Sequence, residues 1–317
     1  MSAVPLGYLD AAGPRAHSIL PLTWFTLIVS ILVCIVVGVI LWIAVRRGTR
    51  VASVATVPVN RGSSGTHWLS VGLSITAVPL VVTIVWTMVA LAATSGPPAR
   101  PGLTLDVTGH QWWWEVRYDS NQPSEVFETA NEIHIPVGVP VLVRLHGGDV
   151  IHSFWVPKLS GKTDTIPGQT NFSWMQARAP GRYWGQCAEY CGAQHAHMAL
   201  EVVADAPADF DRWKARQLQP APEPTSASEK RGQGLVEYRC GLCHEVRGTR
   251  AGAVSAPDLT HLMSRRTIAA GTLPNTPGTV LAWIQGAQQI KPRCLMPDQA
   301  LSAPQLADVS AYLETLK

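Results

Sequence analysis

The sequence predicts a multidomain membrane protein, with a hairpin of two transmembrane helices, a small all-β domain and a small helical unit. Three observations predict this order. Two long segments near the N-terminus contain no charged residue. The stretch that follows alternates apolar and other residues in short runs, separated by glycine and proline. A segment rich in proline, alanine and serine then leads to a last unit with helical patterns.

The composition supports membrane segments and argues against nucleic-acid binding. Only 15% of the 317 residues are charged, which is low for a soluble protein of this size. The formal net charge of +3 is small, so no nucleic-acid partner is expected. The chain contains neither the phosphate-binding pattern G-x-x-x-x-G-K-[ST] nor the hydrolase pattern G-x-S-x-G.

The membrane hairpin is predicted from the two uncharged segments, residues 19–45 and 68–93. Each is long enough to cross a hydrocarbon core of about 30 Å. Trp24 and Trp42 lie near the two ends of the first segment, as expected for tryptophan at membrane interfaces. A cleaved signal peptide is the alternative, but the segment is too long for one and no basic region precedes it closely.

The orientation of the hairpin follows from its loop, residues 46–67. The loop contains no acidic residue and four arginines, which are Arg46, Arg47, Arg50 and Arg61. Because short cytoplasmic loops are enriched in lysine and arginine, we expect this loop in the cytoplasm. Residues 1–18 and 94–317 are then exported, to a compartment that permits haem attachment and oxidised cysteines.

Residues 104–204 predict a small β-sandwich or β-barrel. Residues 132–145 alternate apolar and other side chains, as half-buried strands do. Residues 181–186 and 198–203 are typical of two adjacent strands, and they flank a loop that contains two cysteines. We therefore expect this cysteine loop to join two strands of the β-domain.

The remainder of the chain predicts helices on both sides of a linker. Residues 207–217 are expected to form a short helix, and residues 218–230 a semi-rigid linker. In the last unit, residues 231–317, a helix is expected to run up to Cys240. A final helix is predicted after a capping box at its start, with three apolar residues on one face: Leu306, Val309 and Leu313.

Cys240, Cys243 and His244 form the pattern C-x-x-C-H. Two thiols at this spacing can add to the vinyl groups of a haem, and the histidine can then bind the iron. A redox-active dithiol is the alternative, but the helix before the motif and the exported location favour haem. Met296 is the expected sixth ligand, because a thioether opposite imidazole raises the potential of haem iron. Met263 is the rival, but it lies only about 20 residues after His244, so we expect it to be a packing residue.

We also state what is expected for three further residues. Pro257 is expected to line the histidine side of the haem. Cys294, two residues before the expected ligand Met296, has no evident role. Cys34 lies within the first apolar segment, where a small buried hydrophobe is expected.

The loop CAEYCGAQHAHM combines thiols, imidazole and a thioether. This ligand set is typical of copper, whereas a structural zinc site uses four Cys or His ligands and no methionine. Cys187 and Cys191 could bridge two copper ions, and His195 and Met198 could each bind one. His152 lies 35 residues before Cys187 and is expected to bring a further ligand from a different strand.

Each of these residues also has an ordinary structural explanation. His152 alone would be a satisfied core histidine, and Met198 alone would fill a strand. His197 is an alternative to His195, but it alternates to the other face of the loop. The combined pattern C-x-x-x-C-x-x-x-H-x-x-M favours a pair of coppers. Two bridging thiolates would let the coppers share one unpaired electron, so electron transfer would need little rearrangement.

The chain resembles subunit II of the haem-copper respiratory oxidases, in the caa-type form with a fused C-terminal cytochrome c. The resemblance covers nearly the full length and rests on six segments, GHQWWW (109–114), DVIHSFWVP (149–157), KTDTIPG (162–168), CAEYCGAQHAHM (187–198), CGLCH (240–244) and KPRCLMP (291–297). It implies an all-β cupredoxin domain of the Greek-key sandwich or barrel type and an all-α class I cytochrome c domain. The implied order is an exported segment (1–18), the transmembrane hairpin (19–94), the CuA domain (95–217), the linker (218–230) and the cytochrome c domain (231–317).

The resemblance also implies roles for the residues of the copper loop. Cys187 and Cys191 bridge the two ions of the dinuclear CuA centre. His152 and His195 bind one copper each, and Met198 is a weak axial ligand. In the haem domain the resemblance agrees with the motif, in which two cysteines attach haem c and a histidine and a methionine bind its iron.

Further roles follow from the same resemblance. Glu189 gives its main-chain carbonyl to copper, and its carboxylate reaches a Mg²⁺ ion shared with subunit I. Trp112 corresponds to the tryptophan through which electrons enter CuA, while the two tryptophans after it are expected to be packed aromatics. Asp149 and Asp164 match acidic residues near the copper and the interface with subunit I.

The expected function is electron input to a respiratory terminal oxidase. Electrons would pass from haem c to CuA and then to subunit I, which reduces oxygen to water coupled to proton translocation. Subunits I and III are the expected partners, and cytochrome c or a bc-type complex the expected donor. The expected location is the bacterial plasma membrane, with two membrane-spanning helices and the C-terminal domains on the periplasmic or extracellular face. A linker of this length would raise the local donor concentration to about the millimolar range.

Two alternatives and one departure from the family pattern remain at this point. The chain is also compatible with subunit II of a CuA-type nitric oxide reductase. A membrane-tethered copper chaperone or thiol oxidoreductase would need neither Met198 nor a haem domain. Family members often carry a glutamate near the start of the second membrane helix, but this chain has no acidic residue between Asp10 and Asp106.

Overall fold

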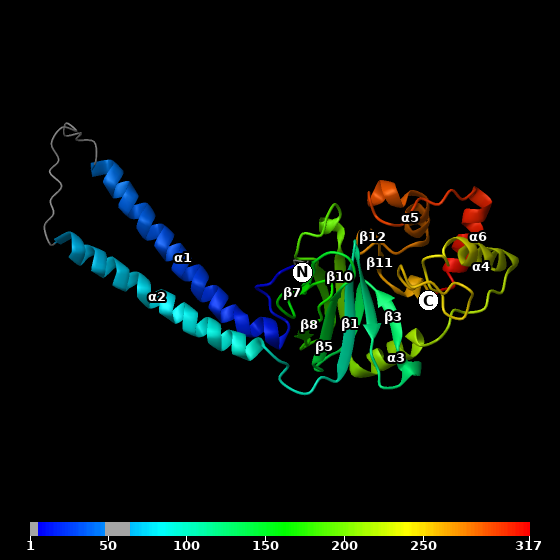
Figure 1. Cartoon of the computed structure of the whole chain (residues 1–317), viewed down its shortest axis with the longest axis horizontal. Helices are drawn as coiled ribbons and strands as arrows, with labels where there is room; N and C mark the ends of the chain where they lie inside the picture. Colours follow the sequence, from blue (N-terminus) through cyan, green and yellow to red (C-terminus); the bar gives the residue numbers. More distant parts are fainter. Residues whose placement is uncertain (1–5, 48–63) are drawn as a thin grey trace. The chain divides into compact units, whose positions relative to one another are not determined.

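The computed structural model describes residues 6–47 and 64–317 (Figure 1). The described residues fall into two compact units, of which one lies within residues 17–95 and the other combines the N-terminal segment up to residue 16 with residues 96–317. The first unit contains most of the two long helices. The second contains all the described strands and shorter helices.

The hairpin unit is built from helices α1 (Pro14–Arg47) and α2 (Ser64–Thr94). By length and composition both helices can cross a membrane. Both extend beyond the predicted segments, 19–45 and 68–93, because helical hydrogen bonding continues into the less apolar residues at each end. Most of the predicted loop lies outside the described residues, including two of its arginines, Arg50 and Arg61.

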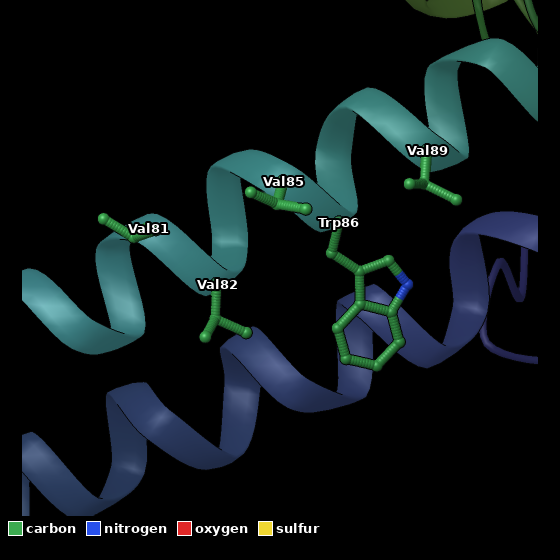
Figure 2. Close-up of a pocket in the computed structure, with 5 residues that line it drawn as sticks. All are labelled: Val81, Val82, Val85, Trp86 and Val89. Atoms are coloured by element: carbon green, nitrogen blue, oxygen red, sulfur yellow. The ribbon is translucent and has the colours of Figure 1, made fainter.

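Side chains within the hairpin unit satisfy their polar groups locally. The hydroxyls of Thr26, Ser30 and Thr83 each donate to a main-chain carbonyl one turn earlier, which suits a helix without water around it. Phe25 of α1 and Trp86 of α2 contact each other, with ring centroids 5.5 Å apart. Figure 2 shows Trp86 beside an open apolar groove that is lined by Val81, Val82, Val85 and Val89.

The β-domain consists of two sheets that share one core, which confirms the predicted sandwich. One sheet has the strand order β3-β2-β1-β5-β8 and the other β4-β10-β9, with β6 and β7 forming a separate pair. The strands are β1 (Leu103–His110), β2 (Trp113–Tyr118), β3 (Phe127–Ala130), β4 (Glu132–Pro136), β5 (Val141–Gly147), β6 (His152–Phe154), β7 (Thr163–Thr165), β8 (Asn171–Met175), β9 (Gly181–Gln186) and β10 (Ala199–Asp205).

Alternation along the strands decides which side chains enter this core. In β5, Val141, Val143 and Leu145 are buried, whereas the residues between them are partly exposed. β4 and β5 together account for the alternating pattern at 132–145. β10 pairs antiparallel with β9 and parallel with β4, so the cysteine loop joins two adjacent strands as predicted.

Helix α3 (Pro207–Gln217) has the predicted bounds and packs on the β-domain. Its Trp213 stacks on the His134 ring, with centroids 4.2 Å apart. The segment after α3 is shorter than the predicted linker, because α4 (Ala227–Arg239) begins inside it at a capping box formed by Ser226 and Glu229. This segment also packs on the helical unit, where the Ala221 amide donates to the carbonyl of Arg247 at 2.9 Å.

The helical unit contains α4, α5 (Pro277–Ile290), α6 (Ala303–Leu313) and the two short strands β11 (Thr267–Ile268) and β12 (Leu273–Pro274). The final helix begins at the predicted capping box and buries Val309 and Leu313. Helix α5 was not predicted. Its signals are a capping box at Thr276 followed by proline, with buried residues at helical spacing, Val280, Ile284 and Ala287.

Candidate metal and haem sites

The cysteine loop is a tight connection between β9 and β10. The amide of Cys187 donates to the carbonyl of Met198 at 2.9 Å, which closes the loop at its base. Gly192 has a left-handed φ of 115°, and a side chain there would lie about 3 Å from Gln111 and Trp112. Glycine therefore permits both the turn and the close approach of Trp112.

Sulfur and nitrogen atoms of the loop and of His152 in β6 lie close together. The sulfurs of Cys187 and Cys191 are 3.8 Å apart, much farther than the roughly 2.05 Å of a disulfide bond. The Nδ1 atom of His152 lies 4.0 Å from the sulfur of Cys187, and that of His195 lies 3.6 Å from the sulfur of Cys191. The Met198 sulfur lies 3.8 Å from that of Cys191. The structure thus brings together the histidines, cysteines and methionine proposed from the sequence.

Glu189 has two separate groups near this site. Its main-chain carbonyl lies 3.3 Å from the Cys187 sulfur, inside the cluster. Its carboxylate is half-exposed and lies 3.6 Å from the ammonium of Lys162, which also pairs with Asp164 at 3.4 Å. The main-chain carbonyl therefore contacts a sulfur, whereas the carboxylate pairs with a lysine and is accessible to solvent.

The donor set is that of a cation site. The hydrogen bond between the sulfurs lowers the pKa of Cys187 and raises that of Cys191, and burial opposes ionisation of both. Without a cation, only one of the two thiols is expected to ionise, because a second negative charge so close by is unfavourable. His152, Cys187 and Cys191 place ligand atoms within 4.8 Å of one another and are all buried. Soft sulfur with imidazole nitrogen fits copper.

Asp149 orients His152 from the other side. Its carboxylate accepts a hydrogen bond from Nε2 of His152 at 2.8 Å, so Nδ1 is left facing the sulfurs. Burial would raise the pKa of Asp149, but the hydrogen bonds from His152 and from the amides of Val150 and Gln111 lower it. The carboxylate therefore stays charged and holds the imidazole in one tautomer. The sequence placed Asp149 near the copper but did not indicate this contact.

Trp112 contacts the cysteine loop directly. Its indole Nε1 donates to the carbonyl of Cys191 at 2.9 Å, and the Gln111 side chain donates to the same oxygen at 2.7 Å. The next two tryptophans pack differently, since Trp113 stacks on a neighbouring histidine and Trp114 is fully buried in the core. Of the three, only Trp112 donates a hydrogen bond to a predicted copper ligand.

The C-x-x-C-H segment forms a compact turn at the end of α4. The amides of Cys243 and His244 both donate to the carbonyl of Cys240. Nδ1 of His244 lies 2.7 Å from the carbonyl of Pro257, so this nitrogen carries the proton and Nε2 is available as a ligand. Pro257 thus lies beside the histidine, as expected. Burial lowers the pKa of His244, which favours the neutral imidazole that binds a metal.

The KPRCLMP segment is organised by Gln288 of α5, which the sequence did not single out. The Gln288 side-chain amide donates to the carbonyls of Cys294 and Met296, both at 2.7 Å, and lies 3.3 Å from the Cys294 sulfur. Met296 and Met263 both pack against the core of the helical unit. The assignment of Met296 as the sixth ligand stays a prediction.

Comparisons with known proteins agree with the division into a β-domain and a helical unit. Residues 120–205 match the family described as "Cytochrome C oxidase subunit II, periplasmic domain", and residues 229–317 match "Cytochrome c". The chain is 34% identical to cytochrome c oxidase subunit 2 of Alkalihalophilus pseudofirmus, over 98% of this chain and 90% of that protein. The chain belongs to the cytochrome c oxidase subunit 2 family.

Other relatives are similar to the chain over shorter lengths. The subunit 2 of Bacillus subtilis is 31% identical and covers 75% of this chain and 69% of its own length. The crystal structure of the periplasmic domain of subunit II from Bradyrhizobium japonicum is 31% identical, covers 38% of this chain and 95% of that one, and has a TM-score of 0.35.

Family membership confirms several of the predictions. As a member of this family, the chain is a subunit of an oxidoreductase, and it carries a fused cytochrome c domain. Its two domain families imply copper at the sulfur-rich loop and haem c in the C-terminal domain. Two helices long and apolar enough to span a membrane, together with a subunit 2 domain, identify a membrane protein with a periplasmic portion.

Proposed function

We propose that this chain is the electron-input subunit of a respiratory terminal oxidase. Electrons would enter at haem c, pass to a dinuclear copper centre and continue to subunit I, where oxygen is reduced to water coupled to proton translocation. The convergence of two cysteines, one histidine and a methionine of one loop with His152 of β6 carries this proposal. That donor set is typical of copper electron-transfer sites.

The protein's part in this function is to hold the donors rigidly and exclude water. Cys187 and Cys191 would bridge the ions, His152 and His195 would bind one each, and Met198 would be a weak ligand. Bound copper supplies one-electron transfer. The strands on either side of the loop and the carboxylate of Asp149 fix the donor positions beforehand, so little needs to move when charge changes.

In the haem domain the same reasoning assigns four residues. Cys240 and Cys243 would attach the porphyrin, and His244 would present its free Nε2 to the iron because Pro257 holds Nδ1. Met296 would complete the axial pair. Trp112 would be the residue through which the copper centre is reached, because its indole is bonded to the Cys191 carbonyl.

Assembly with other subunits forms part of the same proposal. The half-exposed carboxylate of Glu189 would bind a Mg²⁺ ion shared with subunit I, and Lys162 would have to release it. Subunits I and III would pack against the hairpin in a bacterial plasma membrane, with the C-terminal domains on the periplasmic or extracellular face. Cytochrome c or a bc-type complex would supply electrons. Because the hairpin carries no acidic residue, either proton uptake would start elsewhere or the coupling would differ from that of the better-known family members.

Metal analysis of the purified complex tests the proposal. We expect two copper ions in this subunit and the purple absorption of a mixed-valence pair, because two bridging thiolates can share one electron between two ions. One covalently bound haem is expected in the same chain. Zinc in place of copper, a single ion, or a disulfide between the two loop cysteines would contradict the assignment.

Replacing Met296 with alanine tests the axial ligand. The haem should stay covalently attached, because both thioether bonds remain, but its reduction potential should fall when the thioether is lost. A redox titration of the haem band in the purified oxidase measures this change. Met263→Ala is the matched control and should leave the potential unchanged. The opposite pattern in the two variants would move the axial role to Met263.

A further inference from the structure

Lys291 is a buried lysine between the β-domain and the helical unit. It directly follows α5, opens the KPRCLMP segment and is only 3% exposed. Its ammonium donates to three main-chain carbonyls, those of Trp112 at 2.8 Å, His197 at 2.7 Å and Ala269 at 3.1 Å. These contacts use all three of its donors, which offsets the cost of burying a charge.

Two of these acceptors belong to the candidate copper site. The residue that supplies the first carbonyl, Trp112, also donates its indole N–H to the Cys191 carbonyl. His197 lies in the short 3₁₀ turn between the predicted ligands His195 and Met198. Lys291 therefore joins the segment of the predicted haem ligand to the segment of the predicted copper ligands through one side chain.

Other hydrogen bonds around Lys291 also join the β-domain to the helical unit. The Gln194 side chain donates to the carbonyl of Pro292 at 2.9 Å, and the amide of Ala199 donates to the carbonyl of Ala270 at 3.0 Å. The carboxylate of Glu132 in β4 also accepts a hydrogen bond from the amide of Arg266, at 2.9 Å. These hydrogen bonds join main chain as well as side chains, which an occasional encounter between two tethered domains would not produce.

The backbone of the helical unit is shaped for this contact. Ala269, Ala270 and Gly271 all have left-handed φ values, of 53°, 57° and 80°. This turn aims the first two carbonyls at Lys291 and Ala199. At Gly271 a side chain would lie 2.9 Å from the Ala199 and Trp184 side chains, so the two surfaces touch. Non-glycine residues rarely adopt this conformation unless surrounding contacts hold it.

We propose that Lys291 is a positioning residue that keeps the haem domain docked on the copper loop throughout electron transfer. The fused haem domain then stays bound to the β-domain between successive electron transfers. It does not dissociate and dock again on a flexible linker. This inference rests on the proposed function, because it assigns the docked interface to transfer between haem c and copper. It also means that external donors reduce the haem domain, since the Trp112 surface is covered.

The test uses the purified oxidase complex and the variant Lys291→Met, which keeps the length of the side chain but removes its donors. Hydrogen exchange of the segment around Ala199 reports docking directly, because its amide is bonded across the interface. Loss of hydrogen bonds from a charged group should raise this exchange by about tenfold or more. The exposed Lys230 of α4 provides the control, and Lys230→Met should leave exchange unchanged.

A second measurement separates a docked relay from a tether. After flash reduction of the haem, electron transfer to copper should be independent of solvent viscosity in the unaltered protein. In Lys291→Met it should become slower and viscosity-dependent, because docking now precedes transfer. Viscosity-dependent transfer in the unaltered protein, or unchanged exchange in the variant, would overturn the proposal.

Folding and cofactor content are checked in the same samples. If Lys291→Met loses its haem or copper absorption, Gln194→Leu replaces it as the test, since it removes the bond to the Pro292 carbonyl from the opposite surface. Gln194→Leu should then raise the exchange of the segment around Ala199, because it also weakens the interface. If the unaltered complex lacks the mixed-valence copper absorption, the proposed function itself fails. If that absorption is present and docking is unaffected, only the role of Lys291 fails.

Discussion

Replacing Cys191 with serine should abolish the mixed-valence copper signal and reduce oxidase turnover by at least about 100-fold. The Cys191 sulfur lies 3.8 Å from both the Cys187 and the Met198 sulfurs, so it is at the centre of the donor set. A serine hydroxyl is a hard, weakly acidic donor and cannot replace a bridging thiolate. Electron paramagnetic resonance and metal analysis of the purified complex measure the loss.

The haem domain supplies the internal control for this variant. Haem c should remain covalently attached and reducible, because Cys240 and Cys243 belong to the helical unit, whose hydrophobic core is separate from that around Cys191. Cys34→Ser is the matched substitution, since Cys34 is a cysteine of α1 outside both motifs, and it should retain the full copper signal. A mixed-valence signal that survives in Cys191→Ser would show that this sulfur does not bridge.

The second large effect is expected at Gly232, where α4 crosses α6. A methyl group there would lie 2.0 Å from the carbonyl oxygen of Asp308 and 2.9 Å from Cβ of Tyr312. Because the obstacle includes main chain, the helices must move apart, which should cost about 3 kcal/mol. Gly232→Ala should therefore lower the Tm of the haem domain by roughly 15 °C, as followed by circular dichroism of the haem band in the complex.

Gly234 offers a control within the same helix. Among the described residues, no atom outside the neighbouring backbone of α4 lies within 4 Å of a methyl group added there, so Gly234→Ala should raise stability by about 0.5–1 kcal/mol through helix propensity alone. The two substitutions are chemically identical and lie two residues apart. Equal effects of the same sign would show that α4 and α6 do not pack through Gly232.

Local patterns in the sequence were sufficient for most of the fold. The uncharged runs around Cys34 and Trp86 have few structural options, because only a helix satisfies its own backbone in a membrane. The alternating residues of β5 and the bounds of α3 could also be predicted directly from the sequence. Helix α5 was missed because Gly278 and Gly286 interrupt its pattern of apolar residues, and Gly286 has a non-helical backbone conformation. Helix α4 begins before its predicted start because the Ser226 capping box overrides the linker-like composition.

For the site, the sequence alone determined which residue types are present and how closely they follow one another in the chain. Thiols four residues apart beside histidine and methionine favour copper, and C-x-x-C-H favours haem, because spacing within a short loop limits geometry directly. Such spacing brings only neighbours in the chain together. It already indicated His152 as a ligand from another strand, but not how that side chain is oriented.

Only the tertiary structure decided the contacts between distant segments. Asp149 orients His152, Gln288 holds the Met296 segment, and Lys291 joins the haem domain to the copper loop. None of these contacts has a sequence signature. The sequence does not distinguish a lysine that will be buried from one that will be exposed. In addition, 179 residues separate Lys291 from the Trp112 carbonyl that it binds. Its role depends on which carbonyls surround it, and only the packed domains bring those carbonyls together.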